Sequence, residues 1–420
     1  MKGISRFFTL YWIIYFPTCI AYNDLPGFSS VDEAMTVLLF VYTLWMYSHN
    51  RSINKRPWKE FTVCISLIVF YTVYSLLFGA NVSGAVWLDL MQEIRPYAII
   101  YCTWILNPRF TKKQKKWMLS TMVITLFSWI VYHPQTLDTQ VETEFPVLGQ
   151  LAICTGMSWY LFTKETKRNR NIALLLVFTG MLAPKFKFIG EVVCFIAFVF
   201  FIKKRLNFKS PKTMIYVALV IAIILMLTWT RFDAYYVSGL QNEELARPMT
   251  YKTSLRILWD YLPFGSGMGS FACNGAWQHY SPLYFKYNLD GIWGLSPNAG
   301  GFICDAYYPT LAQFGFVGVF FFCWFWKRRL AAFDIIADMR YYRVAMITFC
   351  SLAIEQTADS SWLSGKGMGY CMLIALCLNA NRNAMEQRRR EEMRKEMMEK
   401  RRMATNSENE QLKLAENIKS

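Results

Sequence analysis

The side chains best suited to chemistry lie in one polar, aromatic and glycine-rich stretch, residues 231–318. Arg256 opens a pattern that ends in alternating glycines, and Asp305 stands just before Tyr307 and Tyr308. An arginine fork binds phosphate oxygens at two points, and a carboxylate accepts a proton from a hydroxyl group. Arg256 and Asp305 are therefore the candidate catalytic residues, with Tyr307 and Tyr308 as candidate ligand contacts. A second interpretation of Asp305, as a cap for the helix that follows, stays equally open.

The composition indicates what positions these residues. Of 420 residues, 54% are hydrophobic and only 18% are charged, against about 25% charged residues in ordinary soluble domains. This bias is typical of a polytopic membrane protein. We predict an all-α fold with about twelve transmembrane helices, since a span needs about 20 mainly apolar residues. The predicted spans lie near residues 7–22, 33–48, 60–79, 96–106, 117–133, 147–163, 171–184, 189–203, 213–230, 303–326, 342–357 and 367–380.

The basic residues predict the orientation of the chain. The net charge is +16, and Lys and Arg gather near residues 51–59, 109–116, 164–170, 203–205 and 327–329 and in the tail. The positive-inside rule places these segments and both termini in the cytoplasm. The basic total therefore indicates a lipid bilayer as partner, and no nucleic acid. The predicted units are residues 1–230 (about nine spans), 231–302 (one large outer loop), 303–380 (the last spans) and 381–420 (a charged cytoplasmic tail).

Arg256 and five further cations break this rule by lying on the outer side. Charges close to membrane depth cost free energy unless an acid or an anion meets them. One interpretation is that Arg95 pairs with Glu93 and that the lysines extend toward lipid head groups. The other, which their shared location favours, is an anionic ligand. Its candidate contacts are Arg95, Lys185, Lys187, Arg231 and Arg247.

The glycine pattern is a weak signal when taken alone. Pro263, Gly265, Gly267 and Gly269 follow a helix-like stretch at residues 253–261. A tight turn explains them as well as a ligand contact does, and no strand precedes them, so they are no nucleotide-binding fingerprint.

The order of these motifs nevertheless resembles a known family. Arg256-x-x-Trp259-x-x-x-Pro263-x-Gly265-x-Gly267-x-Gly269, followed by Asp305-x-Tyr307-Tyr308 and by Gly315-x-x-Gly318 at the head of a span, is similar to the O-antigen ligase and O-antigen polymerase (Wzy) superfamily. The nine or so preceding spans resemble it only in topology. Where ligases typically carry His-Asn, this chain has Cys304-Asp305, so the polymerases are the nearer group.

The resemblance implies a GT-C-like glycosyltransferase that needs no metal or cofactor and uses glycans carried on undecaprenyl pyrophosphate. Outward-facing arginines of the family bind the diphosphate. Arg256 matches one of them, and Lys185 and Lys187 stand where many members have an arginine. We therefore expect a polymerase of lipid-linked repeat units at the periplasmic face of the bacterial inner membrane.

Two alternatives remain open at this point. A ligase would move a finished glycan to a lipid or protein acceptor. A transporter of lipid-linked sugar would also have many spans and buried charges, but transporters often carry internal repeats, and the large loop here is confined to the C-terminal third. The sequence leaves the sugars, the oligomeric state and pairing with a chain-length regulator open.

Overall fold

The computed structural model describes residues 2–24, 30–49, 54–55, 57–132, 145–183 and 185–386, with single positions in the tail. Every regular element in these ranges is helical, apart from one isolated bridge between Ser296 and Ala299. The α-helices are α1 (Lys2–Asp24), α2 (Val31–His49), α3 (Trp58–Phe78), α4 (Ser83–Leu106), α5 (Lys112–Tyr132), α6 (Phe145–Phe162), α7 (Lys167–Phe178), α8 (Phe186–Ile196), α9 (Pro211–Tyr236), α10 (Ala246–Asp260), α11 (Asn274–Gln278), α12 (Pro282–Lys286), α13 (Tyr307–Thr310), α14 (Gly315–Asp334), α15 (Met339–Glu355) and α16 (Met368–Leu378).

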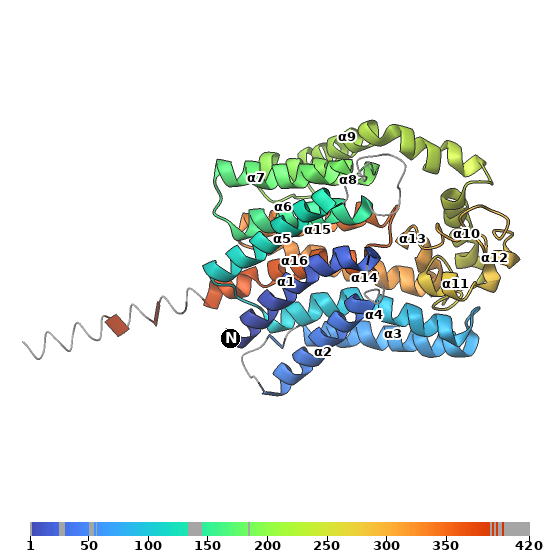
Figure 1. Ribbon diagram of the computed structural model, residues 1–420, viewed down its shortest axis with the longest axis horizontal. Coiled ribbons are helices and arrows are strands. Elements are labelled where there is room, and N and C mark those ends of the chain that lie inside the picture. Colours follow the sequence, from blue (N-terminus) through green and yellow to red (C-terminus); the bar gives the residue numbers. More distant parts are fainter. Residues whose placement is uncertain are drawn as a thin grey trace, which may run out of the picture.

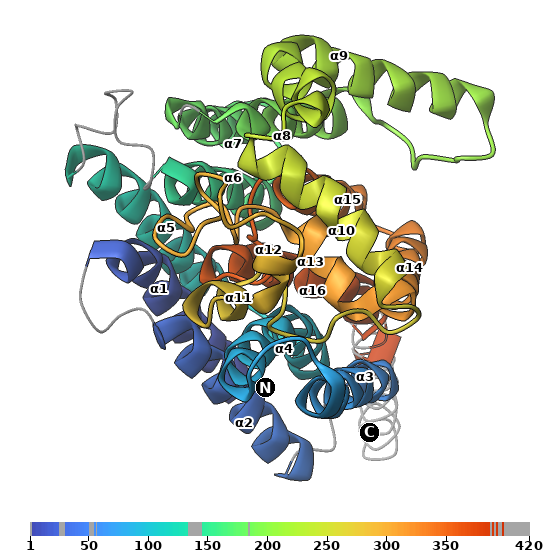
Figure 2. The ribbon, with the colours of Figure 1, turned by 90° about the vertical axis from the view of Figure 1, so that its right-hand side faces the viewer.

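The long helices form a bundle, and the short ones gather at one end of it. In Figure 1 the bundle helices run along the long axis of the molecule, whereas α10, α11 and α12 cover its right-hand end. Figure 2 looks onto that end and shows α10 lying across it. The segment predicted as one large loop, residues 231–302, therefore folds mainly as a cap on the bundle, which we call the helical cap (residues 237–314).

The centre of the bundle is formed by α4 and α16, which pack against each other. Residues 368–377 of α16 are all buried, and most of α4 from Arg95 onward is buried too. A helix that is apolar on every side has no surface suited to water, so a central position in the bundle is expected. The opposite case is α9, which has no buried residue and lies at the outer edge of the bundle (Figure 2).

Among the residues that the structure describes, three helical stretches are long and apolar enough to cross a membrane, namely Trp58–Phe78, Pro211–Gln241 and Tyr307–Asp334. The chain is thus an all-helical protein with the elements of a membrane protein, as the composition indicates. Each of the twelve predicted apolar runs contains helix, but a count of twelve membrane crossings stays a prediction.

Three predicted boundaries are wrong. The short run at residues 96–106 is the second half of α4, which already begins at Ser83, because the polar residues Asp89 and Glu93 are buried in it. The run at 303–326 becomes a long helix only at Gly315. Arg231 lies within α9, not in a loop. The predicted outer loop at residues 133–144, and nearly all of the tail beyond Glu386, fall outside the described residues.

Several of the basic segments meet at the bundle end away from α10. Arg109 forms an ion pair with Glu386 in the first part of the tail, and Arg328 and Arg329 both pair with Glu60. Arg343 of α15 pairs with Glu165 at 3.0 Å. Figure 1 shows the α4–α5 and α6–α7 connections at that end. The charge pattern of the sequence thus separates the two ends of the bundle.

A candidate functional site between the bundle and the helical cap

The segment that links α15 to α16, residues 356–367, runs beneath the helical cap, and we call it the α15–α16 loop. Hydrogen bonds reach it from segments far apart in sequence. The amide groups of Tyr307 and Tyr308 donate to the Gln356 carbonyl, at 3.1 and 3.4 Å, and the Ser360 hydroxyl donates to the Cys304 carbonyl. The loop therefore fixes the backbone on both sides of Asp305.

Lys187, at the start of α8, is bound to two acids of this region. Its Nζ lies 2.5 Å from Glu355 Oε2 and 2.7 Å from Asp359 Oδ2, and its side chain is only 6% exposed. Gln150 Nε2 and Ser361 Oγ also donate to Glu355 Oε2, at 2.8 and 2.9 Å. The charge that the sequence assigned to an anionic ligand is therefore already neutralised by the protein.

The pKa of Asp359 shows how strongly the charges interact in the cluster formed by Lys187, Glu355 and Asp359. Burial by itself would raise the pKa of the Asp359 carboxyl, but the positive charges of Lys187 and Lys366 outweigh burial and lower that pKa to about 2. Opposite charges at such short range favour the ionised form of a carboxyl. Asp359 thus stays charged throughout the neutral range.

Arg95, for which a pair with Glu93 was one of two interpretations, has other partners. Its guanidinium lies 2.7 Å from Asp32 Oδ2 and also binds Glu33, both in the first turn of α2, and it donates to the Leu363 carbonyl. Glu93 instead faces a cavity between α3, α4 and α14, which Tyr307 also lines. The proposed Arg95–Glu93 pair is wrong, because residues two positions apart on a helix point in different directions.

Arg247 and Asp305 form an ion pair under the cap. Arg247 Nε lies 2.5 Å from Asp305 Oδ2, and the two side chains are 14% and 21% exposed. Burial opposes the charge on the guanidinium, but Asp305 raises the pKa of Arg247. The ring of Tyr235 lies 4.4 Å from the guanidinium. The two terminal amino groups of Arg247 have no partner in the described chain and reach the surface.

The two candidate tyrosines, Tyr307 and Tyr308, make structural contacts. Tyr307 is 1% exposed, and its ring packs against Phe322. The Tyr308 hydroxyl donates to the Ala353 carbonyl at 2.9 Å. Both join α13 to α14 and α15 and leave little of their surface for a ligand.

Three predicted cations remain outside the cluster. Arg256 is exposed on α10. Arg231 is exposed at the end of α9, with its guanidinium 5.6 Å from the ring of Phe186. Lys185 lies beside Phe186, in the turn before α8. Within the ranges that the structure describes, no acid forms an ion pair with any of these three, so their charges are available to an anion.

The glycines of the motif act through their backbone. Gly269 has φ +75°, and a Cβ atom there would lie 2.5 Å from the Ala85 carbonyl carbon at the start of α4. Gly267 has φ +91°, and its Cβ would lie 2.8 Å from Gly79 Cα. The Gly269 amide also donates to Asp89 Oδ2 at 2.9 Å. The structure agrees with the tight-turn interpretation of this pattern. The glycines let the backbone of the helical cap pack closely against α3 and α4.

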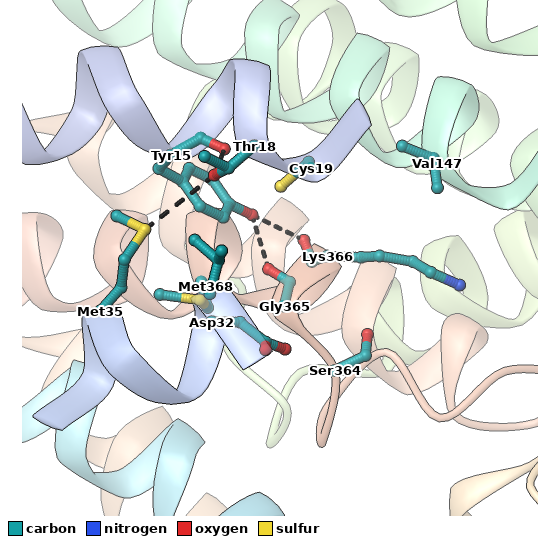
Figure 3. A pocket seen from close by; sticks show the side chains of 11 residues that line it. Tyr15, Thr18, Cys19, Asp32, Met35, Val147, Ser364, Gly365, Lys366 and Met368 are labelled. Atoms are coloured by element: carbon teal, nitrogen blue, oxygen red, sulfur yellow. Dashed lines mark hydrogen bonds between the residues drawn. The ribbon is translucent and has the colours of Figure 1, made fainter. Parts of the chain in front are cut away.

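A cavity lies on the other side of the α15–α16 loop, between α1, α2 and α6. Figure 3 shows the Asp32 carboxylate at its wall and the Lys366 side chain extending away from it. The Tyr15 hydroxyl donates to the carbonyls of Gly365 and Lys366, at 2.9 and 3.0 Å. The loop is thus fixed to α1 as well as to α4 and α8.

The acids that meet Lys187 and Arg95 lie outside residues 231–318, where the candidate site was expected. Glu355 ends the apolar helix α15, Asp359 follows it in the loop, and Asp32 and Glu33 begin α2. The sequence did carry a signal for these acids. They stand at the ends of apolar runs, on the same side as the unexpected cations, and a buried cation needs an acid or an anion.

No known family model and no curated protein matches this chain.

Proposed function

We propose that the chain is a membrane glycosyltransferase of the polymerase type, which joins oligosaccharide repeat units carried on undecaprenyl pyrophosphate. The observation that carries the proposal is the Arg247–Asp305 pair. It combines a guanidinium with two unengaged amino groups and a carboxylate, in one partly open place between the bundle and the helical cap.

The chemistry needs these two kinds of group. The acceptor hydroxyl oxygen forms a bond to the anomeric carbon of the donor glycan, and the bond from that carbon to the phosphate oxygen breaks. The electron pair leaves with the diphosphate, which Arg247 stabilises together with Arg256, Arg231 and Lys185. The proton of the hydroxyl passes to Asp305 as general base.

Lys187 and Arg95 receive a different role from the one expected at first. Their charges are matched by Glu355, Asp359, Asp32 and Glu33. In the proposal they hold the α15–α16 loop, and this loop in turn holds the backbone beside Asp305. They are positioning residues, and in the proposal the diphosphate is bound by Arg247 together with the cations that lack an acid partner.

The topology and location belong to the same proposal. A GT-C-like arrangement of about twelve spans would place the helical cap on the periplasmic side of a bacterial inner membrane and both termini in the cytoplasm. The meeting of basic segments at the end away from α10 supports this orientation, since cytoplasmic segments are rich in Lys and Arg.

The test is a polymerisation assay with purified protein and undecaprenyl-pyrophosphate-linked repeat unit, analysed on a glycan gel. We expect a ladder of products, and its loss in Asp305→Ala and Arg256→Ala variants that still elute as the wild type does in size-exclusion chromatography. Glu243→Ala is the control, because that side chain is 75% exposed and pairs only with Lys252 in the described chain. Transfer of one finished glycan to an added acceptor would indicate a ligase instead, and movement of the lipid across vesicles without a product would indicate a transporter.

A further inference from the structure

One edge of α10 is apolar and uncovered. Leu255, Trp259 and Leu262 are 61%, 65% and 53% exposed, and their spacing of four and three positions puts them on one side of the helix and of the turn after it. The side of α10 that carries Thr253, Ser254 and Ile257 is buried. The exposed edge is therefore a second apolar side, and packing inside the protein does not account for it.

This edge continues onto two helices that are long and apolar enough to cross a membrane. The rings of Trp259 and Phe316 lie 5.2 Å apart, and Phe316 and Phe320 of α14 are 39% and 74% exposed. Both belong to the candidate span Tyr307–Asp334.

On the other side, the turn after α10 contacts the candidate span Trp58–Phe78. Phe264 packs against Phe70 and Tyr74 of α3, and Leu77 and Phe78 at the end of α3 are 69% and 71% exposed. One apolar surface thus extends from the flanks of α3 and α14 up to α10.

The direction of α10 matters for what can cover this surface. Figure 2 shows α10 crossing the end of the bundle and reaching its margin beside α14, and in Figure 1 it stands across the direction of the bundle helices. A helix that lies across the ends of membrane-crossing helices, with an apolar edge directed outward, has the geometry of an interfacial helix. Tryptophan is enriched at that depth, because its ring is apolar and its N–H is polar.

We propose that α10 lies in the membrane interface, with bilayer lipid covering Leu255, Trp259 and Leu262, and that Arg256 binds lipid phosphate groups there. Arg256 directly follows Leu255, is exposed, and has no acid partner within the described ranges. Long basic side chains beside apolar surface place their charge at head-group level. The inference depends on the membrane character of the chain and shares Arg256 with the reaction proposed above, but its test measures contact with lipid and needs no product.

The surface has two other conceivable occupants, a second copy of the chain and another protein. Lipid is favoured because the apolar edge of α10 is continuous with the exposed flanks of α14 and α3, which a membrane would cover in any case. A protein partner would have to displace lipid from those flanks as well.

Site-specific photo-cross-linking separates these occupants. The full chain carrying benzoylphenylalanine in place of Trp259 is reconstituted in vesicles of phosphatidylethanolamine and phosphatidylglycerol, irradiated and analysed by mass spectrometry. The matched control carries the same group in place of Phe285, which is 54% exposed. Phe285 belongs to α12, the helix at the end of the cap away from the bundle (Figure 1). We expect lipid adducts at position 259 at least five times as abundant as at position 285. Equal adducts at the two positions, or a cross-linked band of twice the mass, would overturn the proposal.

Two further variants extend the experiment. Position 262 carries the same photoreactive group in a second variant, in case the change at Trp259 disturbs its contact with Phe316. In an Arg256→Gln background we expect the share of phosphatidylglycerol among the adducts to fall to its share in the vesicles. Both lipids carry a phosphate, but only phosphatidylglycerol has a net negative charge, so a share that does not change would overturn the assignment of Arg256 to anionic lipid phosphate.

Discussion

Arg247 Nε lies 2.5 Å from Asp305 Oδ2, so the carboxylate proposed as general base is bound to a cation proposed as diphosphate ligand. The Asp305 carboxylate and the donor diphosphate would therefore compete for Arg247. A diphosphate that binds Arg247 weakens the hold of Arg247 on Asp305, and this exchange makes the carboxylate available to the acceptor hydroxyl only when the donor is present.

The first prediction concerns this competition. Asp305→Asn removes the negative charge beside Arg247 and keeps nearly the same volume. We expect inorganic pyrophosphate to bind this variant about five to ten times more tightly than the wild type, a change on the order of 1 kcal/mol for a partly exposed pair. Isothermal titration calorimetry in detergent measures the affinity, and product formation should be lost in the same variant.

The control for that experiment is Arg247→Gln, which we expect to lose most of the pyrophosphate affinity. Weaker binding by Asp305→Asn than by wild type would mean that the carboxylate supports the anion site and does not compete with it. No binding by any of the three proteins would count against the diphosphate site as a whole.

The second prediction compares two neighbouring lysines. Lys187→Met leaves Glu355 buried without its cation and leaves Asp359 with only the more distant Lys366, at 3.9 Å. Breaking a buried pair from one side costs about 3–5 kcal/mol. Lys185→Met is the matched control, because Lys185 has no ion pair among the residues described. Thermal unfolding in detergent should show a clear loss for Lys187→Met and nearly none for Lys185→Met. Equal losses would mean that the length of the side chains, and not the ion pairs, stabilises this end of α8.

The third prediction is a pH dependence. The pKa of Asp359 is about 2 in the folded protein and about 4 in an unfolded chain, so the folded state favours the ionised carboxyl. This stabilisation, about 2–3 kcal/mol, is fully present above pH 4 and is lost as the pH falls through 4 toward 2. The unfolding temperature of Asp359→Asn should lie below that of the wild type at pH 6, and the gap should narrow between pH 4 and pH 2. A gap that stays constant over this range would contradict the assignment.

The fourth prediction concerns the glycine motif. Gly269→Ala puts a Cβ atom into the backbone of Ala85 at a positive φ. The backbone conformation alone costs about 1–2 kcal/mol, and the overlap with α4 adds to this cost. Gly291→Ala is the control, since nothing lies within 4 Å of a Cβ atom there. We expect a lower yield of folded protein and a lower unfolding temperature only for Gly269→Ala, measured by fluorescence-detected size-exclusion chromatography. If Gly269→Ala is as stable as wild type but inactive, the motif serves the ligand and not the seating of the cap.

The sequence by itself determined the class of protein and much of its layout. The scarcity of charge and the long apolar runs predicted an all-helical membrane protein, because helix formation and apolar burial depend on residues close together in the chain. The distribution of Lys and Arg separated the two ends of the bundle for the same local reason. The break after α10, at Pro263 and the following glycines, was also visible, since these residues disfavour helix wherever they stand.

Only the tertiary structure decided which charges meet. Glu355 and Asp359 stand 168 and 172 positions from Lys187, and Asp305 stands 58 positions from Arg247. The periodicity of the sequence gives no information on pairs so far apart in the chain, because the packing of separate helices brings these residues together. The same packing buried Asp89 and Glu93 in α4, where the sequence placed a loop, and left Arg256 at the surface. The residue types predicted that cations would gather on the side of residues 231–318, but the fold alone determined which of these cations meet an acid and which remain available to a ligand.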